Sequence, residues 1–282
     1  MIRKACRAGM FYPNTKSQCI QALTPCLSQS NIPTMQNIQA SIVPHAGWMF
    51  SGMTAGKAFQ AIKQSVTPDT FVIFGAVHVP GVRYLSLWSE GTWETPLGSI
   101  DIDSDLVHWL HDNANEYFKD NTQAHMQEHS IEVEIPFIQY LFPNAKIVPI
   151  ATPFDTAAIS LGTKLAEYKE KNIIVLASTD MTHYGYRFQF APAGRAEKAL
   201  NWVKTDNDQR MIRLIQEIKP EEVIPEAYRH YNACGAGAIA ATLAFAKARG
   251  IHSATLLDYT TSMDVYPQGD KDSFVGYSSF IM

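Results

Sequence analysis

Three histidines of this 282-residue chain each follow an apolar segment of strand length, within about six residues of its end. In open α/β sheets, ligands bind beyond the carboxyl ends of the strands, so neighbouring parallel strands would bring the three imidazoles to one rim. Imidazole is the commonest metal ligand, and a histidine cluster suits zinc, copper, iron or nickel. The sequence therefore predicts a metal site at this rim. The histidines are His45, His78 and His183, after Ala40–Val43, Thr70–Phe74 and Ile173–Ala177.

Cys234 stands where an Ala-rich helix, Gly235–Arg249, is expected to begin. A helix N-terminus lowers the pKa of a thiol and favours the thiolate, which is both a nucleophile and a metal ligand. Most free cysteines are small buried hydrophobic residues, so this position gains meaning only beside a histidine cluster. There Cys234 would be a fourth ligand or a redox thiol. The other cysteines lack Cys-x-x-Cys pairing and are assigned a structural role: Cys6, Cys19 and Cys26.

Glu128 and His129 precede the expected helix Ile131–Phe142, with Ser130 as its cap and Glu132 in its first turn. A Glu-His pair at a helix start can transfer protons, but it can equally serve as helix capping and a surface charge. The remaining histidines have no partner at a ligand spacing, so no role is assigned to His108, His111, His125, His230 and His252.

Apolar segments of strand length alternate with helical patterns along the chain, which predicts an α/β fold built from βαβ units. Several strands are apolar throughout, as in a mostly parallel or mixed sheet with helices on both faces. No linker or repeat divides the chain, so residues 1–282 are expected to form a single domain. Tyr84–Ile102 is expected to form a hairpin or excursion. The other predicted strands are Lys146–Ile150, Ala254–Tyr259 and Phe274–Ile281, and the other predicted helices are Met53–Gln64, Thr156–Lys169 (capped by Asp155) and Asp206–Ile218.

The composition excludes several classes of protein. Hydrophobic residues make up 46% of the chain and charged residues 18%, which excludes a disordered or fibrous protein. The net charge is −4, whereas a nucleic-acid-binding protein usually carries an excess of basic residues, so the sequence does not indicate such a protein. No apolar stretch reaches the roughly 18 residues of a membrane span, and no signal peptide is recognisable. Reduced thiols and a cytoplasmic location are expected.

Short motifs along most of the chain together resemble the Memo family, known in bacteria and archaea as protein B of the AmmeMemoRadiSam system. Their order and spacing carry the resemblance more than any single motif does. The motifs are Arg7–Pro13, Pro44–Gly47 with Ser51-Gly52, Gly75–His78, Glu128–Glu132 with Ile135–Phe137, Ser178–Tyr184 and Cys234-Gly235.

This resemblance implies one α/β domain like the LigB-type, class III extradiol dioxygenases, with a cleft that holds a metal-type site. His45, His78 and His183 match the cleft histidines of the family, and Asp180 and Cys234 match its cleft aspartate and cysteine. Family members are linked to iron or copper, to redox behaviour and, in animals, to signalling and phosphotyrosine peptides. Bacterial members accompany a radical-SAM protein and an AMMECR-type protein, which implies pathway partners of those types.

The motifs depart from the family pattern at a few positions, and none of these removes a candidate ligand. The departures are Ala76 in the usual Gly-Pro-x-His, Thr179 and Thr182 in the usual Ser-Ser-Asp-x-Ser-His, and Trp48, where a tyrosine is common. A larger difference separates the family from the dioxygenases, which bind Fe(II) through two histidines and a carboxylate. Cys234 takes the place of that carboxylate, and a thiolate is softer and more easily oxidised. The fold therefore does not imply ring cleavage.

Four functions follow from these residues. The first is a metal-dependent redox or oxygenase-like activity on a small substrate, with iron or copper held by His45, His78 and Cys234. There His183 would be a further ligand or acid–base group, Asp180 would orient a histidine, and Glu128 and His129 would carry protons. The alternatives are a zinc hydrolase with Asp180 or Glu128 as base, a non-enzymatic module binding a (phospho)peptide or small anion, and a scaffold with ordinary histidines.

Overall fold

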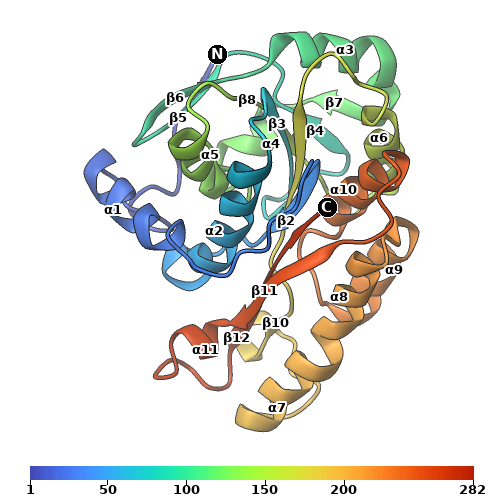
Figure 1. Cartoon of the computed structure of the whole chain (residues 1–282). Helices are drawn as coiled ribbons and strands as arrows, with labels where there is room; N and C mark the ends of the chain where they lie inside the picture. The colour runs from blue at the N-terminus through green and yellow to red at the C-terminus, as the bar shows by residue number, and fades with distance from the viewer.

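A central sheet organises the molecule, and the structure, a computed structural model, describes all residues from Met1 to Met282. The sheet has nine strands in the order β10-β12-β2-β9-β3-β8-β4-β7, with β11 paired to β12 (Figure 1). Four neighbouring strands run parallel, whereas the strands that flank them are antiparallel to them. The strands are β2 (Ala40–Val43), β3 (Thr70–Gly75), β4 (Leu85–Leu87), β7 (Phe118–Asp120), β8 (Lys146–Ala151), β9 (Ile173–Ser178), β10 (His183–Tyr184), β11 (Thr255–Thr261) and β12 (Phe274–Ile281).

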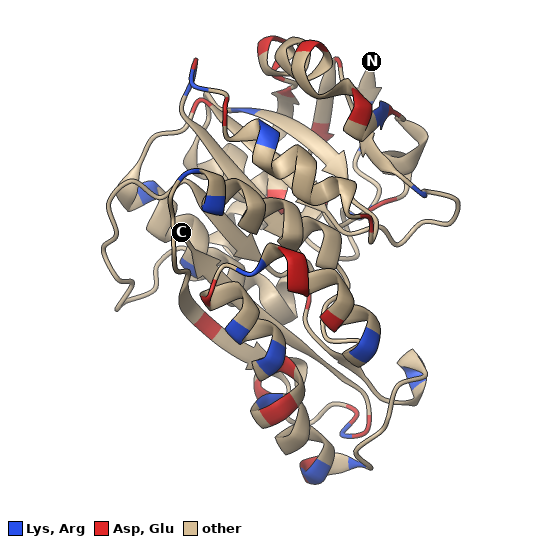
Figure 2. Ribbon diagram, turned by 90° about the vertical axis from the view of Figure 1, so that its right-hand side faces the viewer, with Lys and Arg blue, Asp and Glu red and all other residues tan.

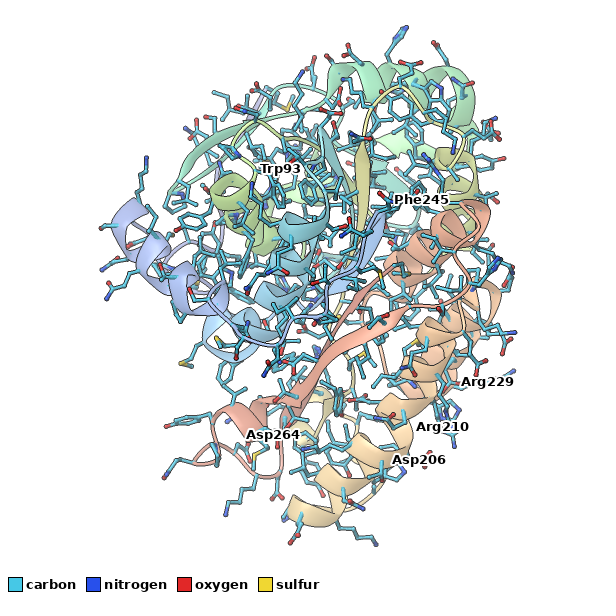
Figure 3. All side chains as sticks on the ribbon, in the orientation of Figure 1. Trp93, Asp206, Arg210, Arg229, Phe245 and Asp264 are labelled. Atoms are coloured by element: carbon cyan, nitrogen blue, oxygen red, sulfur yellow. The ribbon has the colours of Figure 1, made fainter.

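The inner strands are buried on both faces. Every residue of β2, β3 and β9 is buried, and none is charged, so these strands are tan in Figure 2. Strands covered by helices on both sides need this composition. They belong to a core of 70 buried residues that also includes Trp93 and Phe245, at opposite sides of the sheet in Figure 3.

Helices pack on both faces of the sheet (Figure 1). One face carries α1 (Lys16–Cys26), α2 (Trp48–Ser65) and α5 (Ile135–Leu141), and the other carries α6 (Ala157–Leu165), α9 (Pro220–His230) and α10 (Ala236–Ala248). No helix has the length and apolar character that crossing a bilayer requires. The remaining helices and helical turns are α3 (Ser104–Ala114), η1 (Asn115–Tyr117), α4 (Gln123–Met126), η2 (Glu132–Glu134), η3 (Tyr186–Phe188), α7 (Ala196–Trp202), η4 (Val203–Asn207), α8 (Asp208–Gln216) and α11 (Ser262–Val265).

The predicted fold class is confirmed: the protein is an α/β domain with a large, mostly parallel mixed sheet and helices on both faces. All six predicted strands exist, with ends that shift by up to two residues. The predicted helices Met53–Gln64 and Gly235–Arg249 correspond to α2 and α10. Thr156–Lys169 ends earlier, at Leu165, and Asp155 accepts a hydrogen bond from the Ala157 amide at its start (2.9 Å).

The predicted helix Ile131–Phe142 is wrong in its first turn, which is the 3₁₀ turn η2 followed by the short α5. Ser130 does not cap it, because its hydroxyl donates to the Ala76 carbonyl (2.7 Å). Glu132 does not act on the helix dipole either. Its buried carboxylate pairs with Arg3 at 2.8 Å and accepts backbone hydrogen bonds from Cys6 and Arg7, so a long-range contact overrides the local pattern.

Three further segments differ from the prediction. Asp206–Ile218 is the end of a longer column in which α7, a π-helical turn and α8 follow one another. α1 and α9 are not predicted, because each contains an internal proline, Pro25 or Pro225, which disfavours a helix interior. Tyr84–Ile102 does contain an antiparallel hairpin, of β5 (Thr92–Thr95) and β6 (Gly98–Asp101), which forms a separate small sheet with β1 (Ile2–Arg3).

Candidate functional site

The three strands that precede the predicted histidines are neighbours, in the order β2-β9-β3, and they run parallel. Their carboxyl ends therefore meet at one edge. His45 follows β2, His78 follows β3, and their ring centroids lie 5.0 Å apart. Cys234, just before α10, places its Sγ 3.3 Å from Nε2 of His45. One ligand atom from each of these residues lies within 4.8 Å of the others, so the structure brings together the predicted ligands His45, His78 and Cys234.

His45 is almost fully buried, and two hydrogen bonds fix its position. Its backbone amide donates to Oδ1 of Asp180 (2.8 Å), and its Nδ1 lies 3.0 Å from the Ser178 hydroxyl. That hydroxyl donates its only proton to the Ser130 carbonyl (2.6 Å). Ser178 must therefore accept from Nδ1–H, so Nε2 is the ring nitrogen that faces Cys234.

His78 is held in the same manner by a carboxylate. Its Nδ1 lies 2.9 Å from Oε1 of Glu128, which also accepts from the amides of His129 (2.8 Å) and Ser130 (3.0 Å). Burial opposes ionisation of Glu128, but the ring and amide of His78 and the Ser130 amide outweigh it and hold the carboxyl pKa well below its usual range. Because the carboxylate only accepts, Nδ1 carries the proton and Nε2 faces the group of ligands.

His129 lies on the same wall as His78. Its ring stacks on that of His78 at 4.4 Å between centroids and lies 5.3 Å from His45 and 4.7 Å from Phe11. Burial, reinforced by the two neighbouring imidazoles, lowers the pKa of His129 to about 3, so its ring is neutral. Glu128 and His129 thus border the site, in the segment before η2 and not at the start of an α-helix.

His183 lies beside the group but is not part of it. Nε2 of His183 is 3.8 Å from Oδ2 of Asp180, too far for a hydrogen bond, and this buried nitrogen has no hydrogen-bond partner. Burial disfavours the charged ring, but Asp180 and Cys234 outweigh it and raise the pKa of His183 to about 10. An orphaned buried nitrogen near a thiol is compatible with both predicted roles, a further ligand or an acid–base group.

The thiol of Cys234 is the negative centre of the cluster. Burial alone would raise its pKa, but His45, His183 and His78 outweigh that effect and hold the pKa well below its usual value. The amide of Asp180 donates to Sγ at 3.3 Å. In return, Cys234 and Glu128 overcome the effect of burial and raise the pKa of His78 to about 10. The cluster therefore stores protons around a thiolate, and a bound cation would release them.

The donors fit a borderline or soft divalent cation. Two imidazoles with fixed Nδ1 atoms and one thiolate are the ligand types that zinc, copper and iron accept. Hydrogen-bonded partners behind each imidazole are usual for metal-binding histidines. A hard cation such as Mg²⁺ or Ca²⁺ prefers oxygen ligands and does not suit this set.

Sequence reasoning missed the residues behind His45. Ser178 belongs to the family motif Ser178–Tyr184, but the motif predicts no role for it. Glu134 lies within the predicted helix Ile131–Phe142. The Ser178 hydroxyl is 3.2 Å from Oε1 of Glu134, whose Oε2 is buried without a partner. Burial raises the pKa of Glu134 well above its usual value, so this carboxyl is neutral. No local signal marks Glu134, because its role depends on a contact between distant segments.

The fold and the site together define an α/β protein with a His/Cys group at the carboxyl edge of a mostly parallel sheet. More specifically, the chain belongs to the Memo-like protein family, whose model matches residues 3–281. The predicted resemblance is therefore confirmed.

Relatives and one solved structure support this membership. A MEMO1 family protein of Pyrococcus furiosus is 35% identical over 294 residues, which cover 100% of this chain and 99% of the relative. One of Pyrococcus abyssi is 36% identical with the same coverage. The crystal structure of an uncharacterized protein, JW3007, from Escherichia coli K12 aligns with a TM-score of 0.56 over 87% of this chain and 100% of the other. At 12% identity, that likeness supports the fold alone.

Proposed function

We propose that His45, His78 and Cys234 bind one divalent redox-active metal ion, iron or copper, and that the protein carries out redox or oxygenase-like chemistry on a small substrate. The observation that carries the proposal is the convergence of these three ligand atoms within 4.8 Å. Two of the three side chains are also held through their second nitrogen, in the orientation a metal ligand needs.

The surrounding residues would serve the reaction in distinct ways. When bound, the metal ion would supply electron transfer and polarise a bound substrate. His183 would either complete the ligand set or move a proton at its Nε2. Asp180 accepts a hydrogen bond from the His45 amide and has its carboxylate 3.8 Å from Nε2 of His183, and Glu128 orients His78. His129 borders the cleft with a neutral ring, and its low pKa means that it would pass a proton on only transiently and would not store one.

The metal content of the purified protein tests this proposal. After anaerobic purification and loading with Fe(II) or Cu(II), elemental analysis should find about one ion per chain in the wild type. Cys234→Ser and His78→Ala should lose most of it. His108→Ala is the matched control, because that histidine is exposed on α3 and its variant should bind as the wild type does. No stoichiometric iron or copper in the wild type, before or after loading, would refute the proposal.

Two alternatives are separate outcomes of related measurements. Bound zinc with ester or amide hydrolysis that is indifferent to oxygen would assign a hydrolase, with Asp180 or Glu128 as base. Phosphopeptide binding that is lost in His78→Ala would assign a non-enzymatic binding module. Equal, undetectable binding by both proteins would remove that alternative.

The proposal extends to pathway partners of radical-SAM and AMMECR type, which accompany bacterial members of the family. Affinity purification of the tagged chain from its own cells, with Cys234→Ser as a second bait, tests this extension. Absence of both partner types from the purified material would count against it.

A further inference from the structure

A pocket of about 280 Å³ opens directly beside the candidate metal site, with Cys234 and His183 in its lining. Half of its ten lining residues are phenylalanine or tyrosine, and these rings come from distant segments. Phe154 follows β8, Phe188 and Phe190 lie in and after η3, and Tyr228 and Tyr231 lie in and just after α9. Because it borders Cys234, whatever binds in it meets the candidate metal ligands.

Four of the aromatic residues form two ring pairs, called here the two aromatic walls, and several of the lining rings remain exposed to solvent. Phe154 packs edge-on against Tyr228 at 5.2 Å, and Phe190 packs against Tyr231 at 5.1 Å between ring centroids. Tyr228 and Tyr231 remain 62% and 64% exposed, and Phe188 remains 40% exposed. Apolar surface gathered in this way marks a site of interaction more often than chance exposure does.

Tyr231 also has an uncommon backbone conformation. It ends α9 with φ 50° and ψ 38°, in the left-handed region that a bulky side chain rarely adopts. This conformation is strained, and it persists where the surrounding structure enforces it. Here it accompanies a tyrosine ring that lines the pocket, which is a second reason to regard this wall as built for a ligand.

No lysine, arginine, aspartate or glutamate lines the pocket, so no long charged side chain is available to pair with an ion. Its only charged groups are the Cys234 thiolate and the His183 ring, which lie next to each other and offset each other's charge. A phosphate or carboxylate entering among phenylalanines and tyrosines would lose its hydration with little to replace it. The neighbouring pocket beyond Phe188 differs, because Arg187 and Asp270 line it.

We propose that this pocket binds an uncharged, flat aromatic molecule of one or two rings, stacked between the two aromatic walls with one edge against Cys234 and His183. The inference rests on the proposed function, because it names the class of substrate for the same site. It excludes phosphorylated ligands from this pocket. Aromatic rings in offset or edge-on contact with tyrosine and phenylalanine provide the attraction, and the volume accommodates one or two fused rings.

A pair of probes that differ in charge tests the proposal. Naphthol and naphthyl phosphate are titrated separately against the metal-free protein, and their own fluorescence reports binding. Naphthol should bind at least about tenfold more tightly than naphthyl phosphate, because only the phosphate loses hydration without a partner. Equal affinity for the two, tighter binding of the phosphate, or no naphthol binding would overturn the proposal.

Variants locate the binding and separate it from the metal site. Tyr231→Ala should weaken naphthol binding about tenfold, whereas Tyr140→Ala, an exposed tyrosine on α5, should leave it unchanged. Tyr228→Arg should improve binding of naphthyl phosphate, and an unchanged preference in this variant would refute exclusion by charge. An unaffected affinity in Tyr231→Ala would place naphthol elsewhere and overturn the proposal.

The same variants distinguish failure of this inference from failure of the proposed function. Tyr231→Ala should keep the wild-type metal content, because Tyr231 is not among the candidate ligands. Naphthol binding without any bound metal would refute the metal proposal alone. Stoichiometric metal without naphthol binding would refute the pocket alone.

Discussion

The orientation of the His45 ring depends on residues that are fully buried behind it. A chain of polar groups runs from Sγ of Cys234 through the ring of His45 and the Ser178 hydroxyl to the carboxyl of Glu134, with neighbouring atoms 3.0–3.3 Å apart. In this chain, Ser178 selects which nitrogen of His45 carries the proton, and Glu134 is a neutral partner behind it. Both are therefore positioning residues for the candidate site.

Replacing Ser178 should weaken metal binding more than replacing Glu134 conservatively. Ser178→Ala leaves the buried Nδ1–H of His45 without an acceptor, and loss of such an outer partner lowers metal affinity about 10- to 100-fold. Glu134→Gln is the matched control, because the amide is also neutral and keeps a polar group beside the Ser178 hydroxyl. Competition with a chromophoric chelator measures both affinities. Equal losses in the two variants would show a general packing defect and not a role for the hydroxyl.

A second residue-scale prediction concerns His125, which is not among the candidate ligands. Its ring is fully buried between Trp88 and Trp93 and donates from Nε2 to the Ser86 carbonyl (2.8 Å). Burial lowers its pKa to about 4 from 6.5, so the folded protein keeps this ring neutral while the unfolded chain protonates it. Its contribution to stability is complete above pH 6.5 and is lost as the pH falls toward 4.

Urea unfolding at two pH values measures this effect. Between pH 7 and pH 5, His125 should account for a loss of about 2 kcal/mol in unfolding free energy. His125→Gln, which retains a donor for Ser86, should show a smaller loss over this interval. His108→Gln, at an exposed histidine, should keep the wild-type dependence. The same dependence in all three proteins would exclude His125 as its source.

At the scale of elements, the position of the N-terminus of α10 against the sheet determines where Cys234 lies. Two glycines allow the backbone of α10 to lie very close to its neighbours. A Cβ atom added at Gly162 of α6 would lie only 2.0 Å from the carbonyl oxygen of Ala241 in α10. A Cβ atom added at Gly235 would lie 2.8 Å from the carbonyl oxygen of Ser178. The first contact packs two helices together. The second holds the start of α10 against the end of β9, next to Cys234.

These two glycines should respond differently to alanine. Gly162→Ala should cost about 1–3 kcal/mol of unfolding free energy through overpacking, yet the folded variant should keep its metal affinity. Gly235→Ala should also destabilise the protein, and it should lower metal affinity because it displaces Cys234 from His45. Denaturant unfolding and metal titration of both variants check this. Unchanged metal affinity in Gly235→Ala would show that the seating of α10 does not position the thiol.

Local sequence predicted some elements well and others poorly, for physical reasons. α10 is Ala-rich and stops just before Gly250, so its pattern and its end are both local. The region of η2 and α5 is different, because Glu132 turns inward to pair with Arg3, more than a hundred residues away in the chain. α9 is not predicted, because it contains the internal proline Pro225. Its helical turns are stabilised by packing against α8 and α10.

At the scale of the molecule, a metal ion that binds only the folded chain should stabilise all of it. At a free concentration of about 1,000 times the dissociation constant, the added unfolding free energy should be about 4 kcal/mol. Thermal unfolding with and without a chelator measures it, and the increase should disappear in Cys234→Ser. Because binding displaces protons from the thiol and the imidazoles, the stabilisation should also shrink as the pH falls. An equal increase in wild type and Cys234→Ser would place the ion elsewhere.

Apolar segments and residue types are local properties, so the strands buried on both faces, and the histidine that follows each of three of them, could be predicted from the sequence. The family motifs added His45, His78 and Cys234 as candidate ligands. The folded structure was needed to show that β2, β9 and β3 are neighbours, that His183 lies outside the group of three ligands, and that Ser178 and Glu134 support His45. Strand order and buried polar contacts join residues far apart in the chain, and no local pattern records which of the possible pairings has the lowest free energy.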